Sequence, residues 1–320
     1  MTHLPLGPGR EFDRVRAIAQ ALGPQAAVLG DDCAVLGPIA HRVVLSTDVS
    51  VEEVHFSRAW LTLEEIGWRA AAAALSDLAA EGADAIGLLC ALTAPAEATQ
   101  DDIVALMRGV GAAAQEAGGT VLGGDLSRGP AFALAVTVVG RALRPVTRRG
   151  AQPGDGVWVT GVLGGARSAL HAWRAGRRPA PGARAAFAHP IPRIAAGRLL
   201  AQVGASAMVD VSDGLAADAR HLAAASGVRL EIDLGRLPLG DGVSAAAQAI
   251  GYPPAAFAAE GGEDYELLAT VPRAAEAVLR SRAPEAQVPL TRIGEVQAGA
   301  GVACRFEGRE LALEGFDHFR

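Results

Sequence analysis

Lysine is absent from this chain of 320 residues, so every one of its 29 basic side chains is an arginine. Walker-type phosphate loops, kinase-fold ATP sites and Schiff-base enzymes each place a lysine at the chemical centre, so the composition argues against all three. If phosphates are handled here, arginine side chains and metal ions must neutralise their charge. An alternative explanation is a general compositional bias, because alanine, glycine and arginine are all abundant.

Cysteine is also scarce, and Cys33, Cys90 and Cys304 lie far apart in apolar surroundings. This spacing predicts reduced, buried thiols rather than a CxxC pair or a disulfide framework. A net charge of −6 provides no basic footprint for nucleic acid. Residues 1–10 lack the pattern of a signal peptide, and no apolar run reaches membrane-crossing length. We therefore expect a cytoplasmic protein with neither nucleic-acid nor membrane partners.

Two common kinds of hydrolytic site are missing as well. The sequence has no GxSxG elbow, which disfavours a Ser-His-Asp hydrolase. The seven histidines show no HExxH or comparable spacing, which disfavours a zinc centre.

The length and the hydrophobic content, half of all residues, are sufficient for two domains, each with its own core. We place the boundary in a linker that combines a proline with several arginines, so the expected domains are residues 1–142 and 143–320. The linker residues that carry this signal are Arg141, Arg144, Pro145, Arg148 and Arg149.

The most informative stretch begins with the apolar residues 43–45 and continues into Ser46, Thr47 and Asp48. An apolar run bounded by polar residues predicts a buried strand, with the polar cluster at its carboxyl edge, where sheets of α/β type hold ligands. Two hydroxyls and a carboxylate are hard oxygen donors that suit Mg²⁺. The alternative is a strand end whose polar side chains only satisfy a turn.

The succession of an apolar segment and an acid recurs along the chain. Asp32 follows a short apolar run, although Asp31-Asp32 also fits a hairpin turn. Asp77 lies late in an alanine-rich helix that begins with a capping box at Thr62–Glu65. Gly123-Gly124-Asp125 follows a brief strand, and its glycines would expose backbone N–H groups to phosphate oxygens.

The second half repeats the pattern at 207–215, where a strand ends in Asp210-Val211-Ser212-Asp213-Gly214. Ser212 and Asp213 would cap the following helix, 215–226, which is the structural alternative and leaves Asp210 unexplained. Other segments have clear periodicity or caps. They predict helices at 12–22, 62–81, 99–117 and 193–203 and strands at 85–92, 131–140 and 156–160.

Together these acids favour phosphoryl transfer. Carboxylates brought close repel one another, and Mg²⁺ ions relieve that repulsion while bridging phosphate oxygens. Catalysis would then consist mainly of positioning and electrostatics. The acids are Asp32, Asp48, Asp77, Asp125, Asp210 and Asp213.

The ordered set of motifs resembles the thiamine-monophosphate kinase family, whose fold is similar to that of the aminoimidazole ribonucleotide synthetase superfamily. The motifs are Gly30-Asp31-Asp32-Cys33-Ala34, Ser46-Thr47-Asp48 with His55-Phe56, Ser76-Asp77, Gly123-Gly124-Asp125, Asp210-Val211-Ser212-Asp213-Gly214, Gly262-Glu263-Asp264-Tyr265 and Gly315-Phe316-Asp317-His318-Phe319. The resemblance implies a two-domain α+β fold with an N-terminal sheet domain that dimerises and a C-terminal α+β domain that completes the active site.

The activity that the resemblance implies is ATP-dependent phosphorylation of thiamine phosphate to thiamine diphosphate, with several Mg²⁺ ions, in a homodimer. The implied metal ligands are Asp32, Ser46, Thr47, Asp48, Asp77, Asp125, Asp210 and Asp213, with Asp210 also catalytic. The implied ATP contacts are Gly124, Asp125, Arg148 and Ser212. The implied contacts to thiamine phosphate are His55, Glu263 and Phe316. Whether K⁺ is needed is not decided by the residues.

Several alternatives stay open. Arg149 competes with Arg148 for the phosphates, and Met107 stands where the family often has a tyrosine near the nucleotide. Phe316 is either a docked hydrophobic plug or a ring that stacks on the substrate. Rival functions are another ATP-using enzyme of the superfamily, a non-catalytic nucleotide-binding regulator and a Mg²⁺-dependent phosphatase.

Overall fold

The structure, a computed structural model, describes residues 10–26, 36 and 38–316. The chain divides into two compact units, Met1–Leu78 with Asp84–Leu143, and Ala79–Ala83 with Arg144–Arg320. Each unit contains its own β-sheet and its own helices, which confirms the expected two-domain α+β fold. The expected metal ligand Asp32 lies outside the described residues.

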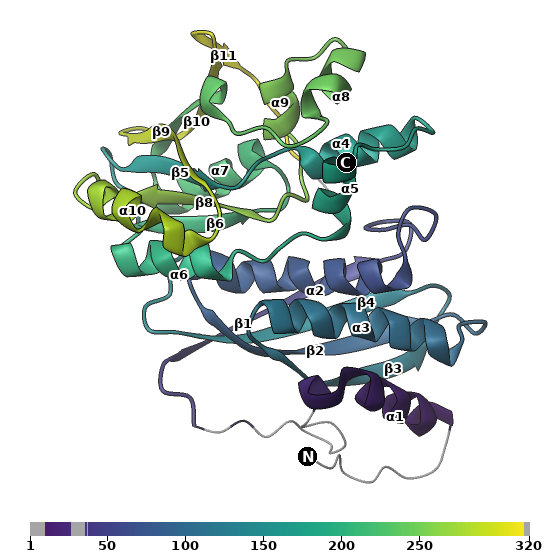
Figure 1. The fold of residues 1–320 in the computed structure, drawn as a ribbon. Helices are drawn as coiled ribbons and strands as arrows, with labels where there is room; N and C mark the ends of the chain where they lie inside the picture. Colours follow the sequence, from purple (N-terminus) through teal and green to yellow (C-terminus); the bar gives the residue numbers. More distant parts are fainter. Residues whose placement is uncertain (1–9, 27–35, 37, 317–320) are drawn as a thin grey trace. The chain divides into compact units, whose positions relative to one another are not determined.

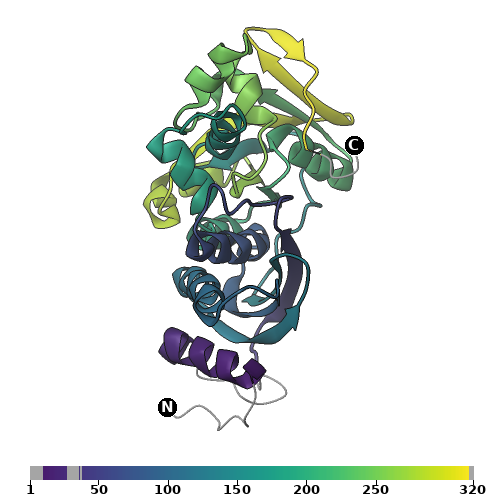
Figure 2. The ribbon, with the colours of Figure 1, turned by 90° about the vertical axis from the view of Figure 1, so that its right-hand side faces the viewer.

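The first unit is a four-stranded sheet in the order β1-β4-β2-β3, with helices α2 and α3 on one of its faces (Figures 1 and 2). Strand β4 pairs antiparallel with both β1 and β2, whereas β2 and β3 are parallel. The elements are α1 Arg10–Leu22, the 3₁₀ helix η1 Gly23–Ala26, β1 Arg42–Val51, α2 Leu63–Ala80, β2 Asp84–Ala94, α3 Gln100–Glu116, β3 Thr120–Arg128 and β4 Ala133–Ala142.

Local signals explain where α2 and α3 begin and how closely they pack. Glu65 Oε2 accepts a hydrogen bond from the Thr62 backbone N–H at 2.9 Å, as the capping box predicts, and Thr99 caps α3 in the same way. A Cβ on Gly67 would lie 1.9 Å from the Leu106 carbonyl oxygen, so the two helix backbones touch there. Glycine is required at this crossing because any side chain would separate the helices.

Three sequence-based expectations about this unit are wrong. Residues 43–45 begin an edge strand, and Val43 and Leu45 are 47% and 66% exposed rather than buried. The polar cluster that follows lies in the middle of β1, because the strand continues to Val51. Similarly, Gly123-Gly124-Asp125 does not follow a brief strand but lies within β3, which continues to Arg128. An apolar run followed by polar residues cannot by itself distinguish a strand end from a strand with one exposed face.

The second unit is built on a seven-stranded mixed sheet in the order β11-β10-β7-β9-β5-β8-β6 (Figure 1). Its strands are β5 Gly156–Thr160, β6 Ala207–Val211, β7 Arg229–Asp233, β8 Glu266–Val271, β9 Leu290–Gln297, β10 Gly301–Phe306 and β11 Arg309–Leu311. Its α-helices are α4 Gly165–Arg174, α5 Pro181–Ala188, α6 Ile194–Val203, α7 Leu215–Ser226, α8 Val243–Ala249, α9 Pro254–Ala259 and α10 Glu276–Arg282. Three 3₁₀ turns complete the described helices, η1 in the first unit and η2 Leu234–Arg236 and η3 Ala283–Ala286 here.

Both faces of this sheet are covered, as the alternation of side chains along β5 shows. Val157 and Val159 belong to a core with residues of α7, α8 and α9, whereas Trp158 belongs to a second core with residues of α6 and α10. Strands buried on both faces read as continuous apolar runs, which is why 156–160 and 207–211 were predictable from the sequence. Strands β7, β9, β10 and β11 were not predicted.

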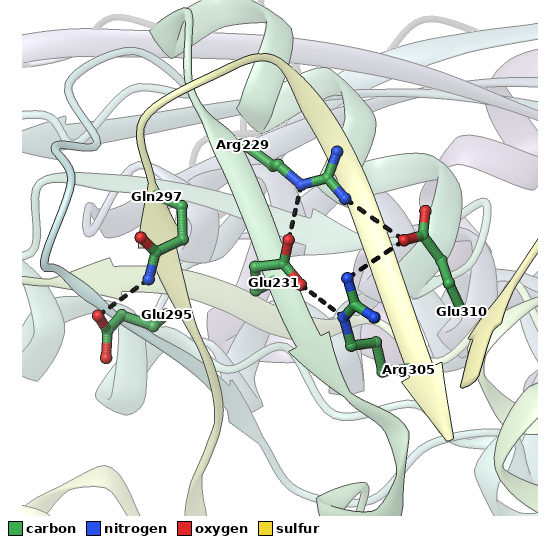
Figure 3. A network of polar contacts seen from close by, with 6 residues as sticks. All are labelled: Arg229, Glu231, Glu295, Gln297, Arg305 and Glu310. Carbon is green, nitrogen blue, oxygen red and sulfur yellow. Dashed lines mark hydrogen bonds and ion pairs between the residues drawn. The ribbon is translucent and has the colours of Figure 1, made fainter. Parts of the chain in front are cut away.

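A network of arginine and glutamate side chains connects β7, β10 and β11 at one edge of the sheet (Figure 3). Glu231 accepts hydrogen bonds from Arg229 at 2.6 Å and from Arg305 at 3.0 Å, and both arginines also reach Glu310 at 3.4 Å. The hydrogen bond from Arg229 is the largest cause that lowers the pKa of Glu231 below its ordinary value. The network links β7, β10 and β11 across their exposed face.

Candidate active site

In the first unit the structure brings together three of the expected metal ligands. Ser46 Oγ donates to Asp77 Oδ2 at 2.5 Å, which joins the middle of β1 to α2. Asp48 lies on the same face of the strand as Ser46, two residues further on, and the Asp77 carboxylate raises its pKa. We call Ser46, Asp48 and Asp77 the first-unit acidic group.

The first-unit acidic group is electrostatically unfavourable. Burial is the larger cause and repulsion by Asp77 the smaller cause that raise the pKa of Asp48 to about 6. Both causes act because the Asp48 carboxylate is partly shielded from water and lies near that of Asp77. A cation bound between them would remove the repulsion, and oxygen donors of this kind are those that Mg²⁺ prefers.

Thr47 and Asp125 lie on the opposite face of the same sheet. The Thr47 and Thr137 hydroxyls are 3.0 Å apart across β1 and β4, on the face away from Asp77. The register places Val49 opposite Ala135 on β4, Ala135 opposite Ala91 on β2, and Ala91 opposite Asp125 on β3.

Directly opposite residues share a face, so Asp125 points to the same side as Val49 and Thr47. Asp125 therefore does not join the first-unit acidic group through its own sheet. Its carboxylate accepts a hydrogen bond from Ser127 Oγ at 2.9 Å.

Gly124 is required by the packing of β3 on β2. A Cβ at this position would lie 1.9 Å from the Cys90 carbonyl oxygen, which belongs to the backbone and cannot move away. The expected use of this glycine, a close approach of the backbone to phosphate, stays a prediction. The observed close approach is to the neighbouring strand.

His55, an expected contact to the substrate, is oriented by the turn that follows β1. Its Nδ1 accepts a hydrogen bond from the Val51 backbone N–H at 3.1 Å, and the His55 backbone N–H donates to the Val51 carbonyl at 2.9 Å. Because Nδ1 is an acceptor, the proton of the neutral imidazole is on Nε2. The ring can therefore donate a hydrogen bond from Nε2.

In the second unit the expected site residues converge on the end of β6, Asp210 and Val211, and on the turn Ser212–Gly214, which connects β6 to α7. The Ser212 carbonyl accepts the Glu263 N–H at 2.7 Å, and the Asp213 carbonyl accepts the Phe316 N–H at 3.0 Å. Phe316 keeps 55% of its surface exposed, so it is not a buried plug in this structure. Backbone hydrogen bonds therefore bring two other segments of the second unit, at Glu263 and at Phe316, to this turn.

Asp210 is 4% exposed and pairs with Leu267 in the ladder between β6 and β8. The cap of α7 is Gly214, which has no side chain, so the alternative that Ser212 or Asp213 caps the helix is wrong. Instead Asp218, in the first turn of α7, accepts a hydrogen bond from the Asp213 N–H at 3.1 Å. Burial, followed by repulsion from Asp210 and Asp213, raises the pKa of Asp218 to about 8.

The segment Glu263–Tyr265 has a strained backbone. Glu263 and Tyr265 have φ values of 72° and 51°, in the left-handed region that favours glycine, at a cost of about 1–3 kcal/mol each. Between them, Asp264 accepts the Gly164 N–H with both carboxylate oxygens, at 2.9 and 2.8 Å. Loss of solvent contact is the largest cause that raises the pKa of Asp264 well above its ordinary value. The hydrogen bonds from Gly164, the N-cap residue of α4, therefore hold this strained segment in place.

The remaining residues expected near ATP are Arg148, Arg149 and Met107. The Arg148 carbonyl accepts a hydrogen bond from Ser226 Oγ, which ties this backbone to the end of α7, and both Arg148 and Arg149 are exposed. Met107 is 4% exposed within α3, so its side chain packs in the core of the first unit.

Sequence reasoning missed Asp218, Asp264 and Tyr265. Each acts on backbone or side chains that the pattern of apolar and polar residues does not reveal. A signal was present for Asp264 and Tyr265, because both lie in the Gly262–Tyr265 motif that was singled out.

A magnesium site fits the chemistry of these residues. Among the described residues, no three His, Cys, Asp or Glu side chains are arranged to hold one metal ion. Mg²⁺ is commonly bound through only one or two carboxylates, with water and substrate phosphates as the other ligands. Pairs of carboxylates such as Asp48 with Asp77 therefore suit it. Within the same part of the chain, no helix is long and apolar enough to span a bilayer.

Comparison with known proteins first identifies the class of protein to which this chain belongs. The chain matches the family models "AIR synthase related protein, N-terminal domain" over residues 30–142 and "AIR synthase related protein, C-terminal domain" over residues 152–307. A thiamine-monophosphate kinase of Halobacterium salinarum is 36% identical, over 95% of this chain and 99% of the relative. The fold is thus that of the AIR synthase related proteins.

Comparison with solved structures identifies the family within this class. The thiamine-monophosphate kinase of Stenotrophomonas maltophilia K279a has a TM-score of 0.82 at 35% identity, covering 97% of this chain and 99% of that one. AaThiL complexed with AMPPCP and TMP has a TM-score of 0.78 at 32% identity, covering 97% of both chains. This chain belongs to the thiamine-monophosphate kinase family.

Proposed function

We propose that this protein catalyses the ATP-dependent phosphorylation of thiamine phosphate to thiamine diphosphate. Membership of the family and the solved complex of a relative with AMPPCP and TMP support this proposal. The observation that carries it in this chain is the convergence of Ser212, Asp213, Glu263 and Phe316 at one turn of the second unit. These residues carry a hydroxyl, two carboxylates and an exposed aromatic ring, and their backbones meet at this turn.

The residues divide into three roles. Glu263 would bind the cationic, amine-bearing rings of thiamine phosphate, Phe316 would stack on one of them, and His55 would donate from Nε2 to its phosphate. Gly124, Asp125, Ser212 and Arg148 or Arg149 would contact ATP. The arginines supply the positive charge that lysine supplies in other phosphate sites.

Mg²⁺ would be held by Asp48, Asp77 and Ser46 in the first unit and by Asp210 and Asp213 in the second, with Asp32, Thr47 and Asp125 as further ligands. When bound, Mg²⁺ would offset the negative charge of the phosphates and of the transition state. The protein's own contribution is to hold the two phosphates in line and the carboxylates in fixed positions, so that little reorganisation is needed. Asp210 is the acid whose loss we expect to affect turnover most.

We also propose a homodimer that pairs through the open face of the first-unit sheet. Val43, Leu45, Val49 and Leu89 lie on this face and are 47%, 66%, 53% and 38% exposed. A contiguous apolar surface on a folded domain is typical of an interface. Thr47 and Asp125 share the face, so their proposed roles depend on this pairing.

The direct test incubates the purified protein with Mg-ATP and thiamine phosphate, with and without K⁺, and separates the products by chromatography. We expect thiamine diphosphate to form, and Asp210→Asn to abolish its formation while the protein stays folded. Asp233→Asn, the same change at the exposed last residue of β7, is the matched control and should retain activity.

Other outcomes identify the rival functions. ATP binding without thiamine diphosphate would indicate a nucleotide-binding regulator. Release of inorganic phosphate from thiamine phosphate in the absence of ATP would indicate a phosphatase.

A further inference from the structure

The chain contains two tyrosines, and the hydroxyl of each donates to a glutamate within the same short stretch of the second unit. Tyr265 Oη donates to Glu263 Oε2 at 2.8 Å. Tyr252 Oη donates to Glu260 Oε1 at 3.2 Å. Glu260 is also bound by Arg167, whose nitrogen lies 3.3 Å from its other oxygen. Only the Tyr265 bond reaches a residue with a proposed role in substrate binding.

Backbone hydrogen bonds and backbone conformation fix the positions of Glu263 and Tyr265. The Glu263 N–H donates to Ser212 and the Tyr265 N–H donates to Val211 at 2.9 Å, so both residues are tied to the end of β6 and the turn that follows. Both have left-handed φ values, which non-glycine residues adopt only when the surroundings impose them. Such strain is concentrated at functional sites, and here it places the two side chains within hydrogen-bond distance of each other.

A glutamate side chain has three rotatable bonds, and ordering it on binding reduces affinity. A hydrogen bond to one carboxylate oxygen restrains those bonds in the free protein, so less ordering remains for the substrate to impose. We propose that Tyr265 is a positioning residue that holds the Glu263 carboxylate ready for the cationic rings of the phosphorylated substrate. This inference rests on the proposed function and assigns the selectivity for a cationic substrate to the pair.

The test is a double-mutant cycle in the full-length protein, with Tyr265→Phe, Glu263→Gln and the double variant. Removing only the hydroxyl should raise KM for thiamine phosphate roughly tenfold, about 1.4 kcal/mol, with kcat and KM for ATP changed less than twofold. The double variant should be no worse than Glu263→Gln alone, since the hydroxyl acts through that carboxylate. Tyr252→Phe, the same chemical change at the other tyrosine, is the matched control and should leave both KM values unchanged.

Three results would overturn the inference. They are an unchanged KM for thiamine phosphate in Tyr265→Phe, effects of the two substitutions that simply add, and a parallel rise of both KM values with a lowered melting temperature. The last of these would indicate a merely structural role.

Equilibrium dialysis with thiamine phosphate separates this inference from the proposed function. If the wild-type protein forms no thiamine diphosphate but binds thiamine phosphate, the proposed function fails while a weaker affinity of Tyr265→Phe still supports the positioning role. Equal affinities would contradict that role, and no binding by the wild-type protein would overturn both.

Discussion

The buried ion pair between Arg193 and Glu266 leads to the sharpest prediction about stability. Glu266, the first residue of β8, is 2% exposed, and its carboxylate accepts hydrogen bonds from Arg193 at 2.8 and 2.6 Å and from Thr160 at 2.5 Å. No room is left around it, because a Cβ on Gly161 would lie 2.0 Å from Glu266 Oε1. The charge of a carboxylate in this position is compensated by its hydrogen-bond partners, since water has little access to it.

Replacing Arg193 by methionine keeps most of the side chain's bulk and removes its charge and donors. Breaking a buried pair in this way costs about 3–5 kcal/mol, because an uncompensated charge is left behind. The Arg193 side chain is 21% exposed, so some water can approach, and we expect a loss of about 3 kcal/mol in the free energy of unfolding. Neutralising the carboxylate as well, in Arg193→Met with Glu266→Gln, should cost less than the sum of the two single changes.

The measurement must resolve the two units, because a chain with two units need not unfold in one step. Urea unfolding followed by hydrogen exchange at β5 and β8 reports on the second unit alone. The reasoning is refuted if Arg193→Met lowers the unfolding free energy of these strands by less than about 1 kcal/mol, or if the double variant is as unstable as simple addition requires. Either result would show that the charge of Glu266 is compensated from elsewhere.

Three further predictions follow from the packing and the surface. Gly124→Ala should lose about 1–3 kcal/mol of stability and disturb the pairing of β2 with β3, whereas Gly123→Ala, whose Cβ would meet only a leucine methyl at 3.3 Å, should be tolerated in the same thermal unfolding assay. Leu45→Asp should shift the protein to monomers in sedimentation velocity, and Ile250→Asp, an equally drastic change at an exposed site of the second unit, should not; a monomeric wild type would contradict the proposed dimer. Glu231 has a lowered pKa, so its stabilisation, about 1 kcal/mol at most, is present above its ordinary pKa and lost as the pH falls through the lowered value. Glu231→Gln should therefore be less stable than the wild type at pH 7 and equal to it in acid, and a gap that persists in acid would refute this.

The sequence predicted best those elements whose signals are local. The helix 215–226 and the strand 156–160 agree with the structure residue for residue. The helix is bounded by Gly214 before it and Gly227 after it, and the strand is buried on both of its faces. The capping box at Thr62 also marked the start of α2, because its two hydrogen bonds form within four residues.

The sequence failed where the outcome depends on distant partners. Residues 43–45 have the same composition whether their strand is central or at an edge, and only the pairing with β4 decides which. The roles of Asp218, Asp264 and Tyr265 were not predicted either. Each holds a group whose neighbourhood is created by the fold, such as the Gly164 N–H, which is 100 residues away from Asp264 in the sequence.

The geometry of β1 limits how its polar residues can serve a phosphate site. Successive side chains of a strand point to opposite faces, so Ser46 and Asp48 face Asp77 while Thr47 faces away with Asp125. Thr47 could join the ion proposed at Asp48 only through its main-chain carbonyl, since its hydroxyl is on the other side of the sheet. If the Thr47 hydroxyl is essential, it must act on a different ion, on the face where the two copies of the proposed dimer would meet. Thr47→Val, which removes the hydroxyl and keeps the carbonyl, separates these two arrangements: retained turnover supports the carbonyl, and lost turnover in a protein that is still dimeric supports a second ion.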